Sequence, residues 1–226
     1  MTDIEGSTRR WEKAPDAMEA ALRRHDRIAE ECVSGFGGTV VKHTGDGVFA
    51  VFDSGRALEC AMALQSAVEE EDWAAAAQLR IRAALHSGPS RSRGGDYFGP
   101  AVSRTARLLE AAWGGQTVLT AAALEACGIP EGAKVRDLGA HMFRDLRAPV
   151  RVFEAYRPKV REDPFPPLRS LSSRPNNLPQ QPTPFVGRER ELGRLLDLAR
   201  SGRHRLITIL GIGGIGKTRL ALQAAG

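Results

Sequence analysis

Long apolar runs are missing from this 226-residue sequence: none approaches the roughly 20 residues needed to span a bilayer, and no basic-then-apolar leader opens it. We therefore expect a cytoplasmic protein without a membrane partner. Cysteine is also scarce, and Cys32, Cys60 and Cys127 stand far apart, outside any CxxC or Cys/His cluster typical of a metal site. We expect all three to be small buried apolar residues.

The basic residues are also not clustered along the sequence. The formal net charge is +5, but the basic residues are scattered among acidic ones rather than gathered in a stripe. Such a diffuse excess is typical of a solvated surface, so we do not expect a nucleic-acid partner. Apolar residues make up 42% and charged residues 26%, which predicts a packed core. The length suits one complete domain and part of another.

Residues 39–52 are the stretch around which the rest is organised. Two β-branched and aromatic runs flank Gly45, Asp46 and Gly47, which predicts a β-hairpin with a turn that tolerates positive φ. Asp46 then lies at the tip, although Asp and Gly are also favoured in plain turns for backbone reasons alone. Four charged residues accompany it: Lys42 just before the turn, and Asp3, Asp96 and Arg107 elsewhere.

Apolar periodicity predicts the other elements of this domain. Apolar positions three to four residues apart indicate amphipathic helices, and alternation indicates strands with one buried face. We expect a loop at residues 90–95, which are rich in Gly, Ser and Arg. The predicted helices cover residues 16–36, 55–71 and 121–127, with another opening at Pro100; beyond the hairpin, the predicted strands cover residues 79–86, 116–119, 133–138 and 150–156.

Residues 1–156, with these charged positions in these frames, resemble the class III nucleotidyl cyclases. The resemblance implies an α+β, ferredoxin-like domain with a central, mostly antiparallel sheet covered by helices. It also implies that Asp3 and Asp46 bridge two divalent ions, Mg²⁺ or Mn²⁺, with the carbonyl of Ile4 as a further ligand. Two such ions suit an in-line displacement of pyrophosphate by the ribose 3′-hydroxyl, and oxygen ligands suit hard ions.

The resemblance also assigns the substrate. Lys42 and Asp96 match the positions that face the purine, where Lys donates and Asp accepts, a polarity that fits adenine and therefore ATP. Arg107 matches the arginine that stabilises charge developing on the α-phosphate. Ser103 stands where the family usually has an asparagine that orients the ribose, so we expect retained binding with reduced turnover.

The family builds its site across a head-to-tail homodimer. Asp3 and Asp46 of one protomer would face Lys42, Asp96 and Arg107 of the other, which gives two equivalent sites. Only two residues precede Asp3, whereas a strand needs about five residues to pair. We therefore expect either a fragment whose true start lies upstream or the loss of the first strand.

A second segment follows a change in composition. Prolines among Ser, Asn and Gln predict an extended linker at residues 157–184. Residues 185–226 resemble the opening of a P-loop (AAA/STAND-type) signalling ATPase: a predicted strand at 206–210 leads into a GxxxxGK[ST] motif and a helix. The expected ATP-phosphate ligands are Gly211, Gly213, Gly214, Gly216, Lys217 and Thr218. No acidic strand of the Walker B kind follows, so this truncated α/β fragment would not hydrolyse ATP.

Two functions remain open at this point. The first is a soluble, dimeric, metal-dependent adenylate cyclase, favoured by the five matching charged residues. The alternative is a catalytically weakened, cyclase-like regulatory protein that binds ATP without converting it, favoured by Ser103 and the short N-terminus.

Overall fold

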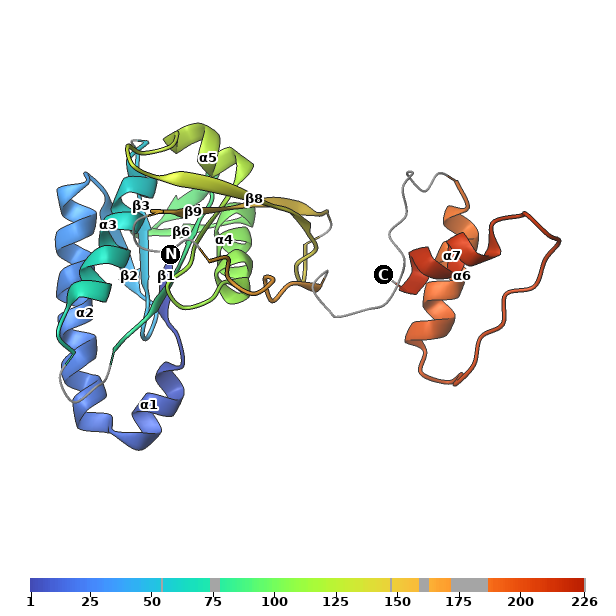
Figure 1. The fold of residues 1–226 in the computed structure, drawn as a ribbon, viewed down its shortest axis with the longest axis horizontal. Helices are drawn as coiled ribbons and strands as arrows, with labels where there is room; N and C mark the ends of the chain where they lie inside the picture. Colours follow the sequence, from blue (N-terminus) through green and yellow to red (C-terminus); the bar gives the residue numbers. More distant parts are fainter. Residues whose placement is uncertain (54, 74–77, 147, 159–162, 172–186, 226) are drawn as a thin grey trace. The chain divides into compact units, whose positions relative to one another are not determined.

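The computed structural model describes residues 1–53, 55–73, 78–146, 148–158, 163–171 and 187–225. The chain divides into two compact units, Met1–Ser173 and Arg174–Gly226. In the first unit a central sheet is covered by helices, while α6 and α7 make up the regular structure described in the second (Figure 1). None of the described helices is long and apolar enough to cross a membrane.

The central sheet has five strands in the order β1-β4-β7-β9-β8. Of its four pairings, β4–β7 is parallel and the other three are antiparallel, so the prediction of a mostly antiparallel sheet is confirmed. The strands are β1 (Thr2–Ile4), β4 (Ile81–Leu85), β7 (Thr117–Thr120), β8 (Lys134–His141) and β9 (Val150–Tyr156).

One face of the sheet is covered by helices α2 (Pro15–Gly35) and α3 (Ala57–Glu70), which lie side by side (Figure 1). Pro15 opens α2, where its missing N–H leaves no backbone hydrogen bond unmade. Ile4 and Ile81 of the sheet pack in one buried cluster with Ile28 and Leu64 of the helices. The short helix α1 (Ser7–Lys13) precedes α2 in the chain, and the short helix α5 (Ala121–Cys127) follows β7.

Helix α4 (Pro100–Ala111) packs on the sheet in a different cluster. Its Leu108 lies with Val118 and Val152, whereas the next strand residue, Leu119, packs with Leu58 of α3. Neighbouring residues of a strand point to opposite faces, so β7 is buried on both sides. All four of its residues are indeed buried.

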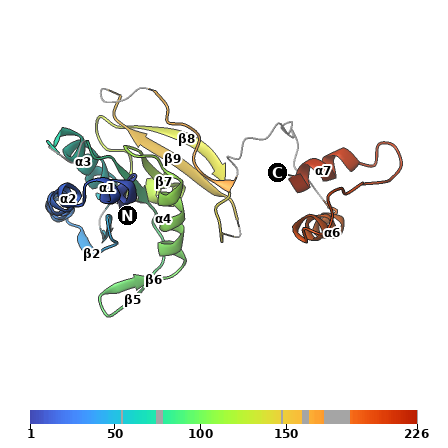
Figure 2. The same cartoon turned by 90° about the horizontal axis from the view of Figure 1, so that it is seen from below.

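Two hairpins lie outside the central sheet. The predicted hairpin is present as β2 (Thr39–His43) and β3 (Val48–Val51). The predicted loop at 90–95 is wrong in part, because β5 (Arg91–Arg93) and β6 (Asp96–Phe98) pair there. Gly94 and Gly95 have φ of 59° and 80°, the backbone that a two-residue hairpin turn requires. Figure 2 shows this hairpin extending from the end of α4.

The first strand is short but present. Its three residues pair with β4 in the register Thr2 with Ala83 and Ile4 with Ile81, so of the two alternatives expected from the sequence the loss of the first strand is wrong. The strand persists at this length because it is enclosed: the Ile4 side chain has no exposed surface, and the backbone N–H of Val48 donates to Thr2 Oγ1.

The first unit extends past the predicted boundary at residue 156. Residues 163–171, here termed the docked segment, pack on it without α-helix or β-strand. Leu168 is 2% exposed, the Trp113 indole N–H donates to the Pro167 carbonyl, and the Arg169 guanidinium lies 3.7 Å from the Trp113 ring centre. The part of the predicted extended linker at 163–171 thus packs on the first unit, while its parts at 159–162 and 172–184 lie outside the described residues.

The second unit contains helices α6 (Glu189–Arg200) and α7 (Lys217–Ala225). The predicted strand at 206–210 does not form within the described residues 187–225. A strand needs a neighbour to pair its backbone groups, and the described part of this unit supplies none. Leu206 and Leu210 are accordingly 82% and 87% exposed.

Candidate active site

The first predicted metal ligand lies on β1. Asp3 stands between the buried residues Thr2 and Ile4, so the pleat directs its side chain to the opposite face of the strand. Arg82 is its cross-strand partner on β4, and the Arg82 guanidinium donates a hydrogen bond to the Asp3 carboxylate. Sequence reasoning did not identify Arg82, because the partner depends on strand register.

The second predicted ligand is brought to β1 by the turn between β2 and β3. A Cβ atom on Gly47 would lie 2.1 Å from the Thr2 carbonyl oxygen, so the backbone of the turn packs directly on β1. Gly45 has φ of 81°, which allows the chain to reverse there. The turn thus places Asp46 close to Asp3, and together they are here termed the aspartate pair.

Electrostatics of the aspartate pair favour a bound cation. Burial raises the pKa of Asp3, the nearby Asp46 raises it further, and Arg82 opposes both. Asp46 Oδ2 is buried and has no hydrogen-bond partner within the described part of the chain. An unpaired buried carboxylate oxygen beside a second carboxylate is the donor chemistry that hard divalent ions prefer.

The ligand set would be a small one. Among the described residues no group of three or more His, Cys, Asp or Glu side chains could hold a metal ion. Two carboxylates with a backbone carbonyl and waters can still serve an ion of the magnesium type, which keeps several of its waters. The residues present therefore fit the predicted ions, with the Ile4 carbonyl as the backbone candidate.

The predicted base-reading residues contact each other. The Lys42 ammonium on β2 pairs with the Asp96 carboxylate on β6, two strands that lie close in space. Asp96 Oδ1 also accepts a hydrogen bond from the backbone N–H of Tyr97 at 2.8 Å. Lys42, and then this N–H, hold the pKa of Asp96 below its usual value. The pair offers one donor and one acceptor at a single place.

Helix α4 carries the two remaining predicted residues. Ser103 is exposed and lies four residues before Arg107, so both occupy one face of the helix. Arg107 donates to both carboxylate oxygens of Glu110 at 2.7 and 2.9 Å and to Asp145 at 2.8 Å. These contacts do not involve the aspartate pair. The spacing to Glu110 was visible in the sequence, whereas the long-range contact with Asp145 had no local signal.

A cleft of about 330 Å³ lies between these elements. Its lining includes Thr2 of β1, Phe49 of β3, Tyr97 of β6 and Thr105 of α4. The volume lies at the lower end of the range of small-molecule sites. The lining includes sequence neighbours of the predicted residues, such as Thr2 and Tyr97, but none of the predicted site residues of this unit themselves.

In the second unit, the lysine of the glycine-rich motif hydrogen-bonds to backbone carbonyls of the same loop. The Lys217 ammonium donates to the carbonyls of Gly211 at 2.9 Å and Ile212 at 2.8 Å. Gly214 and Gly216 have φ of 74° and 86°, and Lys217 begins α7. Gly213 and Thr218 are exposed. Its role in holding ATP phosphates stays a prediction.

Comparison with known proteins shows to which family the chain belongs. No family model matches it. An uncharacterized protein of Mycobacterium tuberculosis is 37% identical over 198 residues, which cover 85% of this chain and 67% of that protein. The chain belongs to the family of this mycobacterial protein. The aligned share exceeds the share of the chain in the first unit, so the similarity of these relatives reaches beyond that unit.

Other relatives show the fold of the first unit. A receptor-type adenylate cyclase of Trypanosoma congolense is 26% identical over 198 residues, covering 68% of this chain and 27% of that protein. The solved structure of adenylate cyclases from Trypanosoma brucei in their monomeric state matches with a TM-score of 0.68 and 25% identity, covering 74% of this chain and 90% of that one. The first unit therefore has the fold of a class III adenylate/guanylate cyclase catalytic domain.

Proposed function

We propose that the first unit is an adenylate cyclase that forms cyclic AMP and pyrophosphate from ATP at a homodimer interface. The observation that carries the proposal is the aspartate pair, two carboxylates from β1 and the β2–β3 turn, with a buried oxygen of Asp46 left unpaired. On a cyclase fold, such a pair is the chemistry expected for holding divalent ions at a triphosphate.

Asp3, Asp46 and the Ile4 carbonyl would hold two Mg²⁺ or Mn²⁺ ions. When bound, these ions would activate the ribose 3′-hydroxyl and neutralise charge on the polyphosphate. Arg82 lies against Asp3 and partly offsets the rise that burial causes in the pKa of that carboxyl. The protein groups thus prepare a site for cations before substrate arrives.

Adenine recognition would come from Lys42 and Asp96. Asp96 accepts from the adenine amino group, and Lys42 donates to a ring nitrogen. Their mutual ion pair holds both groups in place in the absence of substrate. Binding of the base would partly break this ion pair. A Lys42→Glu variant reverses the polarity at this position and should lose the preference for ATP.

Arg107 would stabilise the charge that develops on the α-phosphate, a contribution worth several kcal/mol in related chemistry. Within the described part of its own chain its ion-pair partners are Glu110 and Asp145 rather than the aspartate pair, which suits a site completed by a second protomer. We therefore place the active site at a C2 interface, with Arg107 lent by the partner.

The test is direct. The purified chain is incubated with ATP or GTP and Mn²⁺, and cyclic nucleotides are separated by chromatography. Cyclic AMP should form from ATP, and Asp46→Asn should abolish it, whereas Asp137→Asn, an exposed carboxylate on β8, should change nothing. Equal product from the wild type and Asp46→Asn would refute the proposal.

A second candidate function is an ATP-binding regulatory protein without turnover. Ser103 favours it, since a serine hydroxyl is shorter than the family's asparagine. Two measurements distinguish the candidates: ATP binding by calorimetry and cyclic AMP formation by chromatography. If the first unit binds ATP but forms no cyclic AMP, the regulatory protein is favoured. The glycine-rich loop would bind a further ATP in either case, and Lys217→Ala should remove that binding alone.

A further inference from the structure

The β2–β3 hairpin lies outside the central sheet, so other contacts must fix its position. On the β3 side, the backbone N–H of Val48 donates to Thr2 Oγ1 at 3.1 Å, and Gly47 packs on the Thr2 carbonyl. On the β2 side, the last residue of the strand, His43, faces helix α2. The turn with Asp46 lies between these two attachments.

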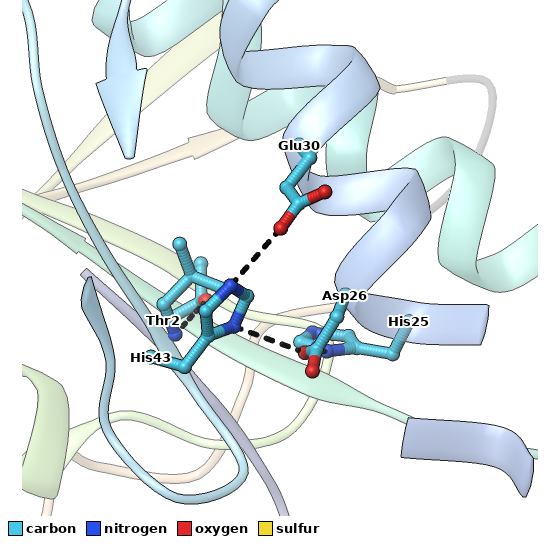
Figure 3. A network of polar contacts seen from close by, with 6 residues as sticks. Thr2, His25, Asp26, Glu30 and His43 are labelled. Atoms are coloured by element: carbon cyan, nitrogen blue, oxygen red, sulfur yellow. Dashed lines mark hydrogen bonds and ion pairs between the residues drawn. The ribbon is translucent and has the colours of Figure 1, made fainter. Parts of the chain in front are cut away.

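His43 lies between two carboxylates of α2, as Figure 3 shows. Its Nδ1 is 3.4 Å from Asp26 Oδ1, and its Nε2 is 3.2 Å from Glu30 Oε1. Asp26 and Glu30 are four residues apart and therefore share one face of the helix. The imidazole ring spans them, and it can donate from one nitrogen when neutral and from both when protonated.

Asp26 is held in turn by a histidine from the core. His25 Nδ1 lies 3.0 Å from Asp26 Oδ1, and the His25 side chain has no exposed surface. Burial lowers the pKa of His25, so the ring is neutral at pH 7 and donates its single proton to Asp26. The polar network thus runs from the core of α2 through Asp26 to the hairpin (Figure 3).

The arrangement is a bridge rather than an ion site. The two nitrogens of His43 point to different carboxylates, so the groups do not converge on one point. Lys42 and His43 are also consecutive on a strand, and consecutive side chains point to opposite sides. His43 therefore contacts α2 while Lys42 contacts Asp96.

We propose that His43 is a positioning residue of the active site. Its bridge to Asp26 and Glu30 fixes the β2 end of the turn, which keeps Asp46 beside Asp3 and Lys42 beside Asp96. The inference deepens the proposed cyclase function and rests on it for its catalytic meaning. A displacement of about 1 Å at such groups can cost about a hundredfold in rate.

The test measures the turn itself as well as its chemistry. Hydrogen exchange of the peptide covering residues 42–48 and Mn²⁺ affinity by electron paramagnetic resonance are compared in the wild type, His43→Ala, His43→Gln and Glu30→Gln. The matched control is Glu19→Gln, an exposed α2 carboxylate that pairs with Arg23. In His43→Ala the turn amides should exchange about tenfold faster and Mn²⁺ should bind roughly fivefold more weakly. His43→Gln, which keeps one donor, should lie between.

Several outcomes would overturn the proposal. The first is a His43→Ala variant whose hydrogen exchange and Mn²⁺ affinity equal those of the wild type. The second is a variant in which exchange accelerates equally in the turn, in β4 and in β7, because His43 would then contribute only to global stability. If His43→Ala does not fold, unchanged turn exchange in Glu30→Gln decides against it. A different result would separate the two proposals. If the wild type makes no cyclic nucleotide but His43→Ala still weakens Mn²⁺ binding, the proposed function is refuted and the positioning role of His43 stands.

Discussion

Asp46 illustrates how a single residue can be unfavourable for folding and useful for chemistry. Its buried Oδ2 has no partner within the described structure, and an unsatisfied buried polar atom costs about 1–3 kcal/mol, more when charged. Asp3 adds a like charge close by. A bound cation would remove both penalties, so the folded protein should be stabilised by Mn²⁺ in proportion to its affinity.

Ser103 is the one proposed catalytic position that departs from the cyclase pattern. Replacing it with asparagine restores the longer amide at the same place on the exposed face of α4. We expect Ser103→Asn to raise the rate of cyclic AMP formation about fivefold, equivalent to one hydrogen bond of about 1 kcal/mol. Initial rates at saturating ATP measure it. Ser103→Ala serves as the control, and no gain in the asparagine variant would count against the assigned role.

His25 makes stability depend on pH. Its pKa is lowered by burial, so below about pH 6.5 the unfolded chain takes up a proton that the folded chain resists. The contribution to stability is complete above that pH and is lost as the pH falls. His25→Gln should therefore flatten the fall in unfolding free energy between pH 7.5 and 5 by up to about 1.4 kcal/mol per pH unit. Urea titrations measure the slope; parallel curves would contradict the assignment. His86, with a pKa lowered in the same way, retains part of the slope.

The individual site residues were largely accessible from the sequence. Asp3, Asp46, Lys42 and Asp96 stood out by chemical type and local frame, and the structure brings them together as two pairs. Their supporting partners were not accessible. Arg82 depends on strand register, and Asp145 and Glu30 on tertiary packing, none of which a local pattern specifies.

At the scale of elements, the hairpin turn depends on its packing against β1. Gly47→Ala would place a methyl group 2.1 Å from the Thr2 carbonyl oxygen, so the turn must move away from β1. We expect a loss of about 1–3 kcal/mol in unfolding free energy and at least a tenfold loss in Mn²⁺ affinity.

Gly45→Ala is the matched control for that change. It meets open space, although its φ of 81° imposes a strain of about 1–2 kcal/mol. Urea denaturation and Mn²⁺ titration compare the two variants. If Gly45→Ala lost as much Mn²⁺ affinity as Gly47→Ala, contact with β1 would not be the cause.

Elements with strong periodicity were predictable, and those that depend on partners were not. The helix at 121–127 matches the prediction residue for residue, because Thr120 caps it and Gly128 ends it. The β5–β6 hairpin was missed although Gly94 and Gly95 are a recognised turn signal, since each of its strands has only three residues. The strand at 206–210 had the right composition, but no neighbour in the described unit pairs with it.

At the scale of the whole molecule, the proposed interface makes a quantitative prediction. Asp46→Ala and Arg107→Ala chains should each be inactive alone. Mixed after unfolding and refolding together, half of the dimers are mixed and each has one intact site, so about a quarter of wild-type cyclic AMP formation should return. A mixture that stays inactive, although size-exclusion chromatography shows dimers, would contradict a site shared between protomers.

The division of the chain was predictable in outline only. Proline-rich composition indicated where regular structure stops, but composition does not say whether an irregular segment packs on its neighbour. Leu168 is buried and Arg169 stacks on the ring of Trp113, and such contacts between segments far apart in sequence are a property of the folded unit.

The contacts of the docked segment also determine which parts of the first unit would bear a mechanical force applied along the chain. The Leu171 N–H donates to the Met142 carbonyl, the Arg169 N–H to the Ala111 carbonyl, and the Arg169 guanidinium pairs with Glu5. Tension along the polypeptide from residue 172 onward would therefore be borne first by the loop after β8, then by the end of α4 and the loop after β1, and only later by β9. Helix α4 carries Arg107, and the loop directly follows the strand that carries Asp3, so a pull at this attachment would act on the spacing of the proposed catalytic groups.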